Sequence, residues 1–332
     1  MNYIGSKIKL TPFIYDSIIK YVDNLDDKVF CDLFAGTGAI GKYFKTKCLT
    51  IISNDLEYYS YVLNKNYIEN NDRKYISLKY IDYLNNLKIK ENGFIFKNYS
   101  LEGHGERLYF SDKNAKKIDT IRMEIENLYK SKEISDNEYY FLLASLLEAS
   151  DKVANTASVY GAYLKKLKKT ALQDLILKPA FFDIYGKNHI VFNKDANILI
   201  KEIEGDILYL DPPYNQRQYG SNYHLLNTIS LYKNDFEPKG KTGLPNYNKS
   251  EYCKKNNVLN VFDDLIKNAK FKYIFLSYNN EGLMSEEDVK NIMSKYGEYH
   301  LEKIVYKRFK ADSNRNNLTD TTFEYLHVLI KN

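Results

Sequence analysis

Cysteine is scarce in this chain, and no long apolar run is present. Only three of the 332 residues are cysteines. Cys31, Cys48 and Cys253 have neither the spacing of metal ligands nor that of a disulfide framework. No stretch approaches the roughly 18 apolar residues of a membrane span, and residues 1–7 lack the basic-then-apolar layout of a signal peptide. We therefore expect a reduced, cytoplasmic protein with no bound metal and no membrane attachment.

A strong charge of either sign is also missing, because the formal net charge is only +5. That value is at most a weak indication of a polyanionic partner. The hydrophobic content of 44% is sufficient for a packed core. A chain of this length holds one large α/β domain, or one such domain with an inserted module.

Two of the six prolines stand side by side at the end of the most informative stretch. The apolar residues 207–210 predict a buried strand, and Asp211, Pro212, Pro213 and Tyr214 follow it. Open α/β sheets form ligand crevices at the carboxyl ends of their strands. A carboxylate and a proline carbonyl there suit the two hydrogens of a ring amine, and an aromatic side chain suits the ring face. A strand that merely ends in a proline turn would show the same residues, so the motif needs support from elsewhere.

A glycine-rich turn at residues 32–38 provides such support. It lies between a predicted buried strand and the start of a helix, the order typical of a nucleotide site. Gly36 and Gly38 allow the backbone to approach a ligand, but no Gly-Lys-Ser/Thr follows, so this is not a phosphate loop. Asp32 would repel a pyrophosphate and attract an ammonium group. The turn therefore indicates an amino-acid-bearing nucleoside such as S-adenosylmethionine.

Two further acids follow predicted strands. Asp55 ends the second strand, about 20 residues beyond the glycines, where an acid suits ribose hydroxyls. Asp195 follows the strand at 189–192, where a third strand offers an acid to the adenine of a cofactor. Each acid taken singly is also compatible with a helix cap or a turn. The ordered pair of glycine turn and ribose acid favours a cofactor site.

Residues 91–188 show no alternation of strands and helices. The stretches 115–130 and 137–153 both have the apolar spacing of helices, so we interpret 91–188 as an inserted, mainly helical target-recognition module. We assign residues 1–90 and 189–332 to the catalytic domain. The module contains a basic run suited to tracking a phosphate backbone, although a solvated helix face is the alternative. Its lysines are Lys165, Lys166, Lys168 and Lys169.

The end of the chain predicts how the sheet closes. Strands are expected at 273–277, about 300–306 and about 323–330, and the last two are joined directly. Strands joined in this way pair antiparallel. The predicted fold is therefore α/β, with a Rossmann-like, mostly parallel sheet and one antiparallel strand.

Taken together, these motifs resemble the D12-class (alpha-type) DNA adenine-N6 methyltransferases. The likeness extends over nearly the whole chain and includes the N-terminal residues 3–7, the turn at 32–38, Asp55 and the motif at 211–214. The run 214–219 is similar to the methylases of type II restriction-modification systems, of the FokI and NlaIII kind. The family binds S-adenosylmethionine in a methyltransferase sheet, and the resemblance implies the same here. The residues that it assigns to the cofactor are Tyr3, Lys7, Asp32, Phe34, Gly36, Gly38, Asp55 and Asp195.

The resemblance also implies a reaction. A methyl group would pass from S-adenosylmethionine to N6 of an adenine flipped out of duplex DNA, with no metal involved. The residues implied to hold the adenine are Asp211, Pro212, Pro213 and Tyr214. Arg217, Gln218 and Tyr219 follow this turn, so we expect them against the DNA strand around the base. The implied partners are double-stranded DNA and a cognate restriction endonuclease that acts on the same site.

Other functions remain open from the sequence. Cytosine N4 and RNA adenine are chemically similar targets, although Asp211 argues mildly against the first and the long insertion against the second. A non-catalytic DNA-recognition protein on the same fold is a different class, which the complete motif at 211–214 disfavours. A nicotinamide dehydrogenase is disfavoured by Asp32.

Overall fold

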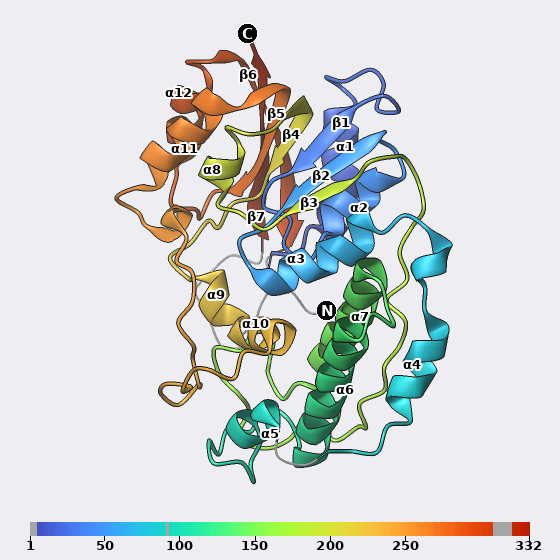
Figure 1. Ribbon diagram of the computed structural model, residues 1–332. Helices are drawn as coiled ribbons and strands as arrows, with labels where there is room; N and C mark the ends of the chain where they lie inside the picture. Colours follow the sequence, from blue (N-terminus) through green and yellow to red (C-terminus); the bar gives the residue numbers. More distant parts are fainter. Residues whose placement is uncertain (1–4, 91–92, 308–320) are drawn as a thin grey trace. The chain divides into compact units, whose positions relative to one another are not determined.

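The computed structural model describes residues 5–90, 93–307 and 321–332 (Figure 1). Within these ranges the chain forms two compact units, each built from several separate segments. The sheet unit holds residues 6–56, 185–218, 249–307 and 321–332. The helical unit holds residues 5, 57–90, 93–184 and 219–248. These bounds follow packing, so the functional division into a catalytic domain and an inserted module stays a prediction.

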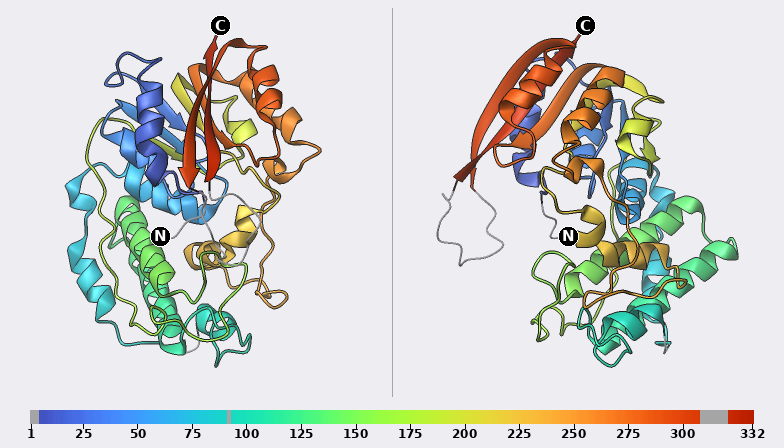
Figure 2. Two further views of the ribbon diagram at one scale, coloured as in Figure 1. Left: turned by 180° about the vertical axis from the view of Figure 1, so that it is seen from behind. Right: turned by 90° about the vertical axis from the view of Figure 1, so that its left-hand side faces the viewer.

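A seven-stranded sheet forms the centre of the sheet unit, in the order β3-β2-β1-β4-β5-β7-β6. All neighbours from β3 to β5 pair parallel, whereas β7 pairs antiparallel with both β5 and β6. In Figure 2, β6 and β7 lie side by side as long red strands. This confirms the predicted mostly parallel sheet with one reversed strand. The strands are β1 Val29–Asp32, β2 Thr50–Asn54, β3 Ile190–Phe192, β4 Glu204–Leu210, β5 Lys270–Asn279, β6 Gly297–Lys307 and β7 Thr321–Lys331.

Helices cover both faces of the sheet, which explains why β1 and β4 are almost continuously apolar. On one face, Cys31 and Leu208 pack in a core with residues of α8, α11 and α12. On the other face, the ring of Phe30 stacks on Phe44 of α2 with 4.3 Å between ring centroids. The helical segments of this unit are η1 Ile8–Leu10, α1 Thr11–Ile18, α2 Ala39–Lys45, α8 Ala196–Leu199, η4 Glu251–Cys253, α11 Val258–Asn268 and α12 Glu286–Met293.

The strand order reverses between β1 and β4. From β1 the chain builds outward through β2 to β3, whereas β4 returns to the other side of β1 and continues to β5. Adjacent strands that diverge in this way open a crevice at their carboxyl ends. Asp32 ends β1 and is paired with Tyr209 of β4. The fold therefore brings the end of β1 and the motif after β4 to one crevice.

In the helical unit, α6 Asp112–Lys130 and α7 Asp136–Val153 form a long helical hairpin, as predicted from the apolar spacing. Ser135 begins α7 with a capping box that includes Glu138. The buried Arg122 donates to the carbonyls of Ile229 and Ser230 at the end of α10, both at 3.0 Å. The other helical segments are α3 Tyr58–Asn64, η2 Lys65–Glu69, η3 Arg73–Tyr75, α4 Leu78–Asn85, α5 Phe94–Tyr99, α9 Tyr219–Asn222 and α10 His224–Leu231. Across the described ranges, no helix is both long and apolar enough to cross a membrane.

Candidate active site

The side chain of Asp32 is buried, and only one of its two oxygens has a hydrogen-bond partner among the described residues. Its side chain is 1% exposed, and Oδ2 accepts a hydrogen bond from the Gly41 amide at 3.2 Å. Among the described residues, Oδ1 has no hydrogen-bond partner. A buried carboxylate oxygen without a donor is costly. The geometry therefore suits a ligand group that donates hydrogen bonds and carries positive charge.

The pKa of Asp32 agrees with that interpretation. Burial raises it to about 8, the nearby charges of Asp211 and Asp55 raise it as well, and the Gly41 amide lowers it. The carboxyl group thus holds a proton at neutral pH while no ligand is bound. An ammonium group placed at Oδ1 would replace that proton as the source of positive charge.

The glycine turn and Asp55 hold each other in place. Gly36 and Gly38 both have positive φ, 51° and 77°, which glycine adopts without a steric penalty. The Gly36 amide donates to Oδ2 of Asp55 at 2.8 Å. The side-chain amide of Asn54, the residue before Asp55, donates to the carbonyls of Leu33 and Lys194, both at 3.1 Å. The ends of β1, β2 and β3 are thereby joined into one rigid rim.

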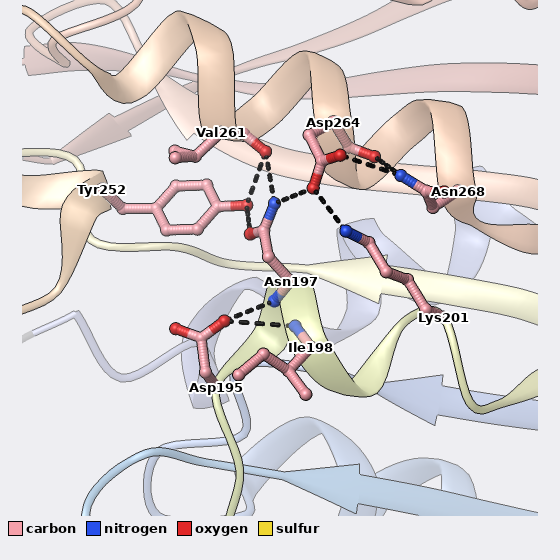
Figure 3. A network of polar contacts seen from close by, with 8 residues as sticks. All are labelled: Asp195, Asn197, Ile198, Lys201, Tyr252, Val261, Asp264 and Asn268. Atoms are coloured by element: carbon pink, nitrogen blue, oxygen red, sulfur yellow. Dashed lines mark hydrogen bonds and ion pairs between the residues drawn. The ribbon is translucent and has the colours of Figure 1, made fainter.

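Asp195 follows β3 and caps a short helix. Its Oδ1 accepts from the amides of Asn197 at 2.9 Å and Ile198 at 3.2 Å, and Figure 3 shows the other carboxylate oxygen turned away from these donors. Asp195 therefore serves as a helix N-cap, one of the roles that the sequence left open for it. Its predicted contact with a cofactor adenine stays a prediction.

A polar network around Asn197 connects Asp195 to Tyr252 (Figure 3). The Asn197 side chain donates to Asp264 at 2.9 Å and accepts from the Tyr252 hydroxyl at 2.9 Å. The ring of Tyr252 meets Phe34 edge to face, with 5.1 Å between centroids. Two predicted cofactor residues from distant segments are thus held by one set of contacts. Sequence reasoning missed Asn197 and Tyr252, because neither lies in a motif.

Asp211 lies at the end of β4 and forms an ion pair with Lys7, whose Nζ is 3.0 Å from Oδ1. Lys7 is buried, which disfavours its charge, but the charges of Asp211 and Glu324 outweigh burial and raise its pKa above the usual range. Burial raises the pKa of Asp211, and Lys7 lowers it. The lysine therefore favours the ionised form of the carboxylate. The resemblance implied that Lys7 binds the cofactor, and the structure joins it to the motif at 211–214.

Tyr214 lies beside the same cation. Lys7 Nζ is 5.7 Å from the centroid of the Tyr214 ring, and the ring of Tyr278 meets that ring edge to face at 6.3 Å. Burial raises the pKa of Tyr214, and the charge of Glu324 on β7 adds to that shift. The same charge helps to raise the pKa of Lys7. Sequence reasoning missed Glu324 and Tyr278. Tyr278 lies on β5, the neighbour of β4, and Glu324 comes close because β7 pairs with β5.

The residues predicted to contact DNA after the motif have different surroundings. Arg217 is exposed, and its amide donates to Oδ1 of Asn215 at 2.9 Å in a tight turn. Gln218 is engaged within the protein, because its side chain donates to the Ser250 carbonyl at 3.2 Å and accepts from the Ser250 amide at 2.7 Å. Tyr219 belongs to the helical unit. These observations favour Arg217 over Gln218 as a ligand contact.

The basic run of the helical unit lies in a loop and not on a helix, and its contact with phosphates stays a prediction. Lys165, Lys166 and Lys169 are exposed. Lys168 differs, because its Nζ donates to the Thr156 carbonyl at 2.7 Å. The fully buried Asn155 accepts from the Lys168 amide at 3.0 Å and fixes this loop.

Tyr3, which the resemblance assigned to the cofactor, lies outside the described residues. Within the described ranges, no group of three or more His, Cys, Asp or Glu side chains is arranged to hold a metal ion.

The mostly parallel sheet with helices on both faces defines an α/β protein whose fold is consistent with a methyltransferase. The sequence matches the family described as D12 class N6 adenine-specific DNA methyltransferase over residues 3–292, so the chain belongs to this family. It is an adenine-specific DNA methyltransferase and acts on DNA. Family membership confirms the predicted resemblance and decides against the dehydrogenase and the cytosine-N4 alternative.

Named relatives agree with this assignment. Type II methyltransferase M.NlaIII of Neisseria lactamica is 56% identical, covering 100% of this chain and 99% of the relative. Type II methyltransferase M.CviAII of Paramecium bursaria Chlorella virus 1 is 41% identical over 94% of this chain and 93% of the relative. Type II methyltransferase M.FokI of Planomicrobium okeanokoites is 44% identical over 94% of this chain, which spans 50% of that longer protein.

Replacing Asp32 with Asn should change how stability depends on pH. The folded-state pKa of about 8 exceeds the ordinary 3.8, so the folded protein binds more protons than the unfolded chain between these values. The free energy of unfolding of the wild type should therefore fall as the pH rises from about 5 to about 8. Asp32→Asn should lose part of that slope, on the order of 1 kcal/mol or more over the interval. Urea titrations at both pH values measure it, and parallel slopes for the two proteins would contradict the assignment.

Neutralising Lys165, Lys166 and Lys169 to Gln should weaken DNA binding for all sequences alike. Each lost phosphate contact should also reduce the slope of log affinity against log salt by about 1. Lys168→Gln is the matched control, because its ammonium is engaged by Thr156. Fluorescence anisotropy over a range of salt concentrations measures both effects. Equal slopes for the triple variant and the wild type would show that the loop does not contact DNA.

Proposed function

We propose that this methyltransferase transfers a methyl group from S-adenosylmethionine to N6 of an adenine extruded from duplex DNA. The observation that carries the proposal is the juxtaposition of two acids at the strand-order reversal, the buried Asp32 at the end of β1 and the half-buried Asp211 after β4. Oδ1 of Asp32 lacks a donor among the described residues and suits a cation, whereas Asp211 is already paired with Lys7. The two acids thus suit different ligands in one crevice.

The residues around Asp32 fit the proposed cofactor. Oδ1 of Asp32 is the acceptor for the ammonium group of the methionine part, and Gly36 and Gly38 permit close approach of the backbone. Asp55 is the acceptor for ribose hydroxyls, and Phe34 with Asp195 would border the adenine. S-adenosylmethionine supplies an electrophilic methyl group on a positively charged sulfur. The chain's own residues would bind this cofactor and orient its methyl group.

At the target base, Asp211 and the Pro212 carbonyl accept the two hydrogens of the N6 amine. The lone pair of N6 is delocalised into the ring, and these acceptors favour the tetrahedral geometry in which it becomes available. Lys7 favours the ionised carboxylate and so keeps Asp211 an acceptor. A bond would form between N6 and the methyl carbon as the methyl–sulfur bond breaks, and N6 would then release one proton to the solvent. Most of the acceleration comes from alignment of the reacting atoms.

Tyr214 would stack on the adenine, which must leave the duplex to reach this crevice. We propose that Arg217 contacts the strand around the extruded base, with Tyr219 nearby in the chain. The exposed lysines of the loop at 165–169 would contact phosphates elsewhere.

We further propose that the modification protects DNA from a restriction endonuclease with the same recognition site. The support is the naming of the relatives M.NlaIII, M.FokI and M.CviAII as type II methyltransferases. The same role would put the enzyme in the cytoplasm with its DNA. Incubating the protein with labelled S-adenosylmethionine and duplex DNA, then identifying the labelled base, tests the function. Label on cytosine, on RNA alone or on no base would refute it.

Asp211→Asn should separate catalysis from binding. Asparagine keeps the size and one acceptor oxygen but removes the charge and turns a donor toward the amine. A charged group aimed at a transition state is typically worth about 3–4 kcal/mol, so the methylation rate should fall about a hundredfold or more. Single-turnover methylation at saturating cofactor measures this, with cofactor affinity as the internal control. Wild-type rates would mean that residues 211–214 are merely a proline turn.

Binding of S-adenosylmethionine should release about one proton at pH 6.5. The cofactor's α-amino group is charged at that pH, and Asp32, with its pKa of about 8, is still protonated. The ammonium group would displace the carboxyl proton into the solvent. Titration calorimetry in buffers of different ionisation enthalpy counts the protons. Asp32→Asn should release none, and equal release from both proteins would place the ammonium elsewhere.

A further inference from the structure

The loop that follows β5, residues 279–284, is tied to the backbone of Tyr214. The Leu283 amide donates to the Tyr214 carbonyl at 3.1 Å. The same amide lies 3.1 Å from the hydroxyl oxygen of Tyr278, which also accepts from the Met284 amide at 3.4 Å. One side-chain oxygen thus gathers two successive amides of this loop, which we call the β5 loop. It holds Leu283 against the residue proposed to stack on the base.

Gly282 brings the β5 loop over the ring of Tyr278. A Cβ added at Gly282 would lie 2.1 Å from Cε1 of Tyr278, so no larger residue fits without movement. The Asn279 carbonyl accepts from the Gly282 amide at 3.3 Å, and the Asn279 side chain accepts from the Glu281 amide at 3.0 Å. The loop is therefore a tight turn folded back on the strand that precedes it. Its shape depends on the absence of a side chain at Gly282.

Tyr278 is well placed to be a fixed support. It is 2% exposed near the end of β5, between β4 and β7 in the sheet. Burial raises its pKa to about 12, and the two loop amides lower it, so the hydroxyl stays neutral. Its ring meets that of Tyr214 edge to face at 85°. The same residue thus contacts Tyr214 directly through its ring and indirectly through Leu283.

We propose that Tyr278 and Gly282 are positioning residues that fix Tyr214 for stacking on the extruded adenine. The β5 loop anchors the backbone of Tyr214, and the Tyr278 ring limits the tilt of its side chain. This inference rests on the proposed role of Tyr214 in base capture. A preset stacking surface lowers the entropy lost when the base arrives, so the loop acts on base capture and methyl transfer and leaves the cofactor site unchanged.

Tyr278→Phe tests the support, because it removes the hydroxyl and keeps the ring. The single-turnover methylation rate should fall about tenfold, the effect of losing an acceptor for two amides. Cofactor affinity should stay within about twofold. Fluorescence of 2-aminopurine at the target position should show less extrusion. Gly282→Ala, which displaces the loop by a different route, should reproduce this pattern.

Tyr299→Phe is the matched control. It removes the hydroxyl of a half-buried tyrosine on β6, two strands from β5 in the sheet, whose partner is His327 at 2.8 Å. Both Tyr→Phe variants should lose similar thermal stability, but only Tyr278→Phe should lose rate and extrusion. A rate for Tyr278→Phe equal to that of Tyr299→Phe would overturn the proposal.

A double-variant cycle separates this inference from the proposed function. If Tyr278 acts through Tyr214, Tyr278→Phe should cost no further rate once Tyr214→Ala is present. A further tenfold loss in that background would overturn the positioning role. Should Tyr214→Ala methylate at the wild-type rate, the proposed stacking role itself fails. An impaired Tyr214→Ala with an unimpaired Tyr278→Phe refutes only the present inference.

Discussion

The burial of Asp32 beside the charge of Asp211 is the constraint on which the site depends. The parallel pairing of β1 with β4 brings the two acids to the same end of the sheet, where burial first and then the charge of Asp211 raise the pKa of Asp32. The buried Lys7 is paired with Asp211. Asp32 is left to hold a proton or a ligand cation. Of the two acids in this crevice, Asp211 is paired with a lysine and Asp32 is not. This difference in charge makes Asp32 suited to an ammonium group and Asp211 suited to a neutral amine.

The segments around these acids are held by side chains that form hydrogen bonds with backbone groups. These side chains are neutral, unlike the acids. Asn54 bonds the carbonyls of Leu33 and Lys194 and so fixes the ends of three strands. Tyr278 fixes the β5 loop, and Asn155 does the same for the lysine loop of the helical unit. Neutral amides and hydroxyls suit this task because they satisfy buried backbone groups without adding charge. A further carboxylate or lysine in such a place would alter the pKa values on which the crevice depends.

Family membership accounts for the motifs of this sequence. The contacts that each predicted site residue makes within the protein differ, and these contacts decide whether the residue can meet a ligand. Lys7 pairs with the motif at 211–214, Gln218 is engaged by the Ser250 backbone, and Lys168 is engaged by Thr156. Arg217, next to Gln218, and Lys166, close to Lys168, remain exposed. Membership of one run in the sequence therefore does not make residues equivalent. The hydrogen bonds available within the protein decide which member remains available to a ligand.

The sequence by itself determined the strand-and-helix order, the reversed strand near the end of the chain, and the three acids that follow β1, β2 and β4. These features are local: apolar runs, glycines, adjacent prolines and a direct connection between two strands. The tertiary structure alone decided what lies beside each acid. Glu324 approaches Asp211 because β7 pairs with β5, and Tyr278 meets Tyr214 because β5 pairs with β4. Tyr252 meets Phe34 across some 200 residues of chain. Burial, which raises the pKa of Asp32, is likewise a property of all the segments that pack around a group. No local pattern encodes it, because the atoms that exclude water from Asp32 come from distant parts of the sequence.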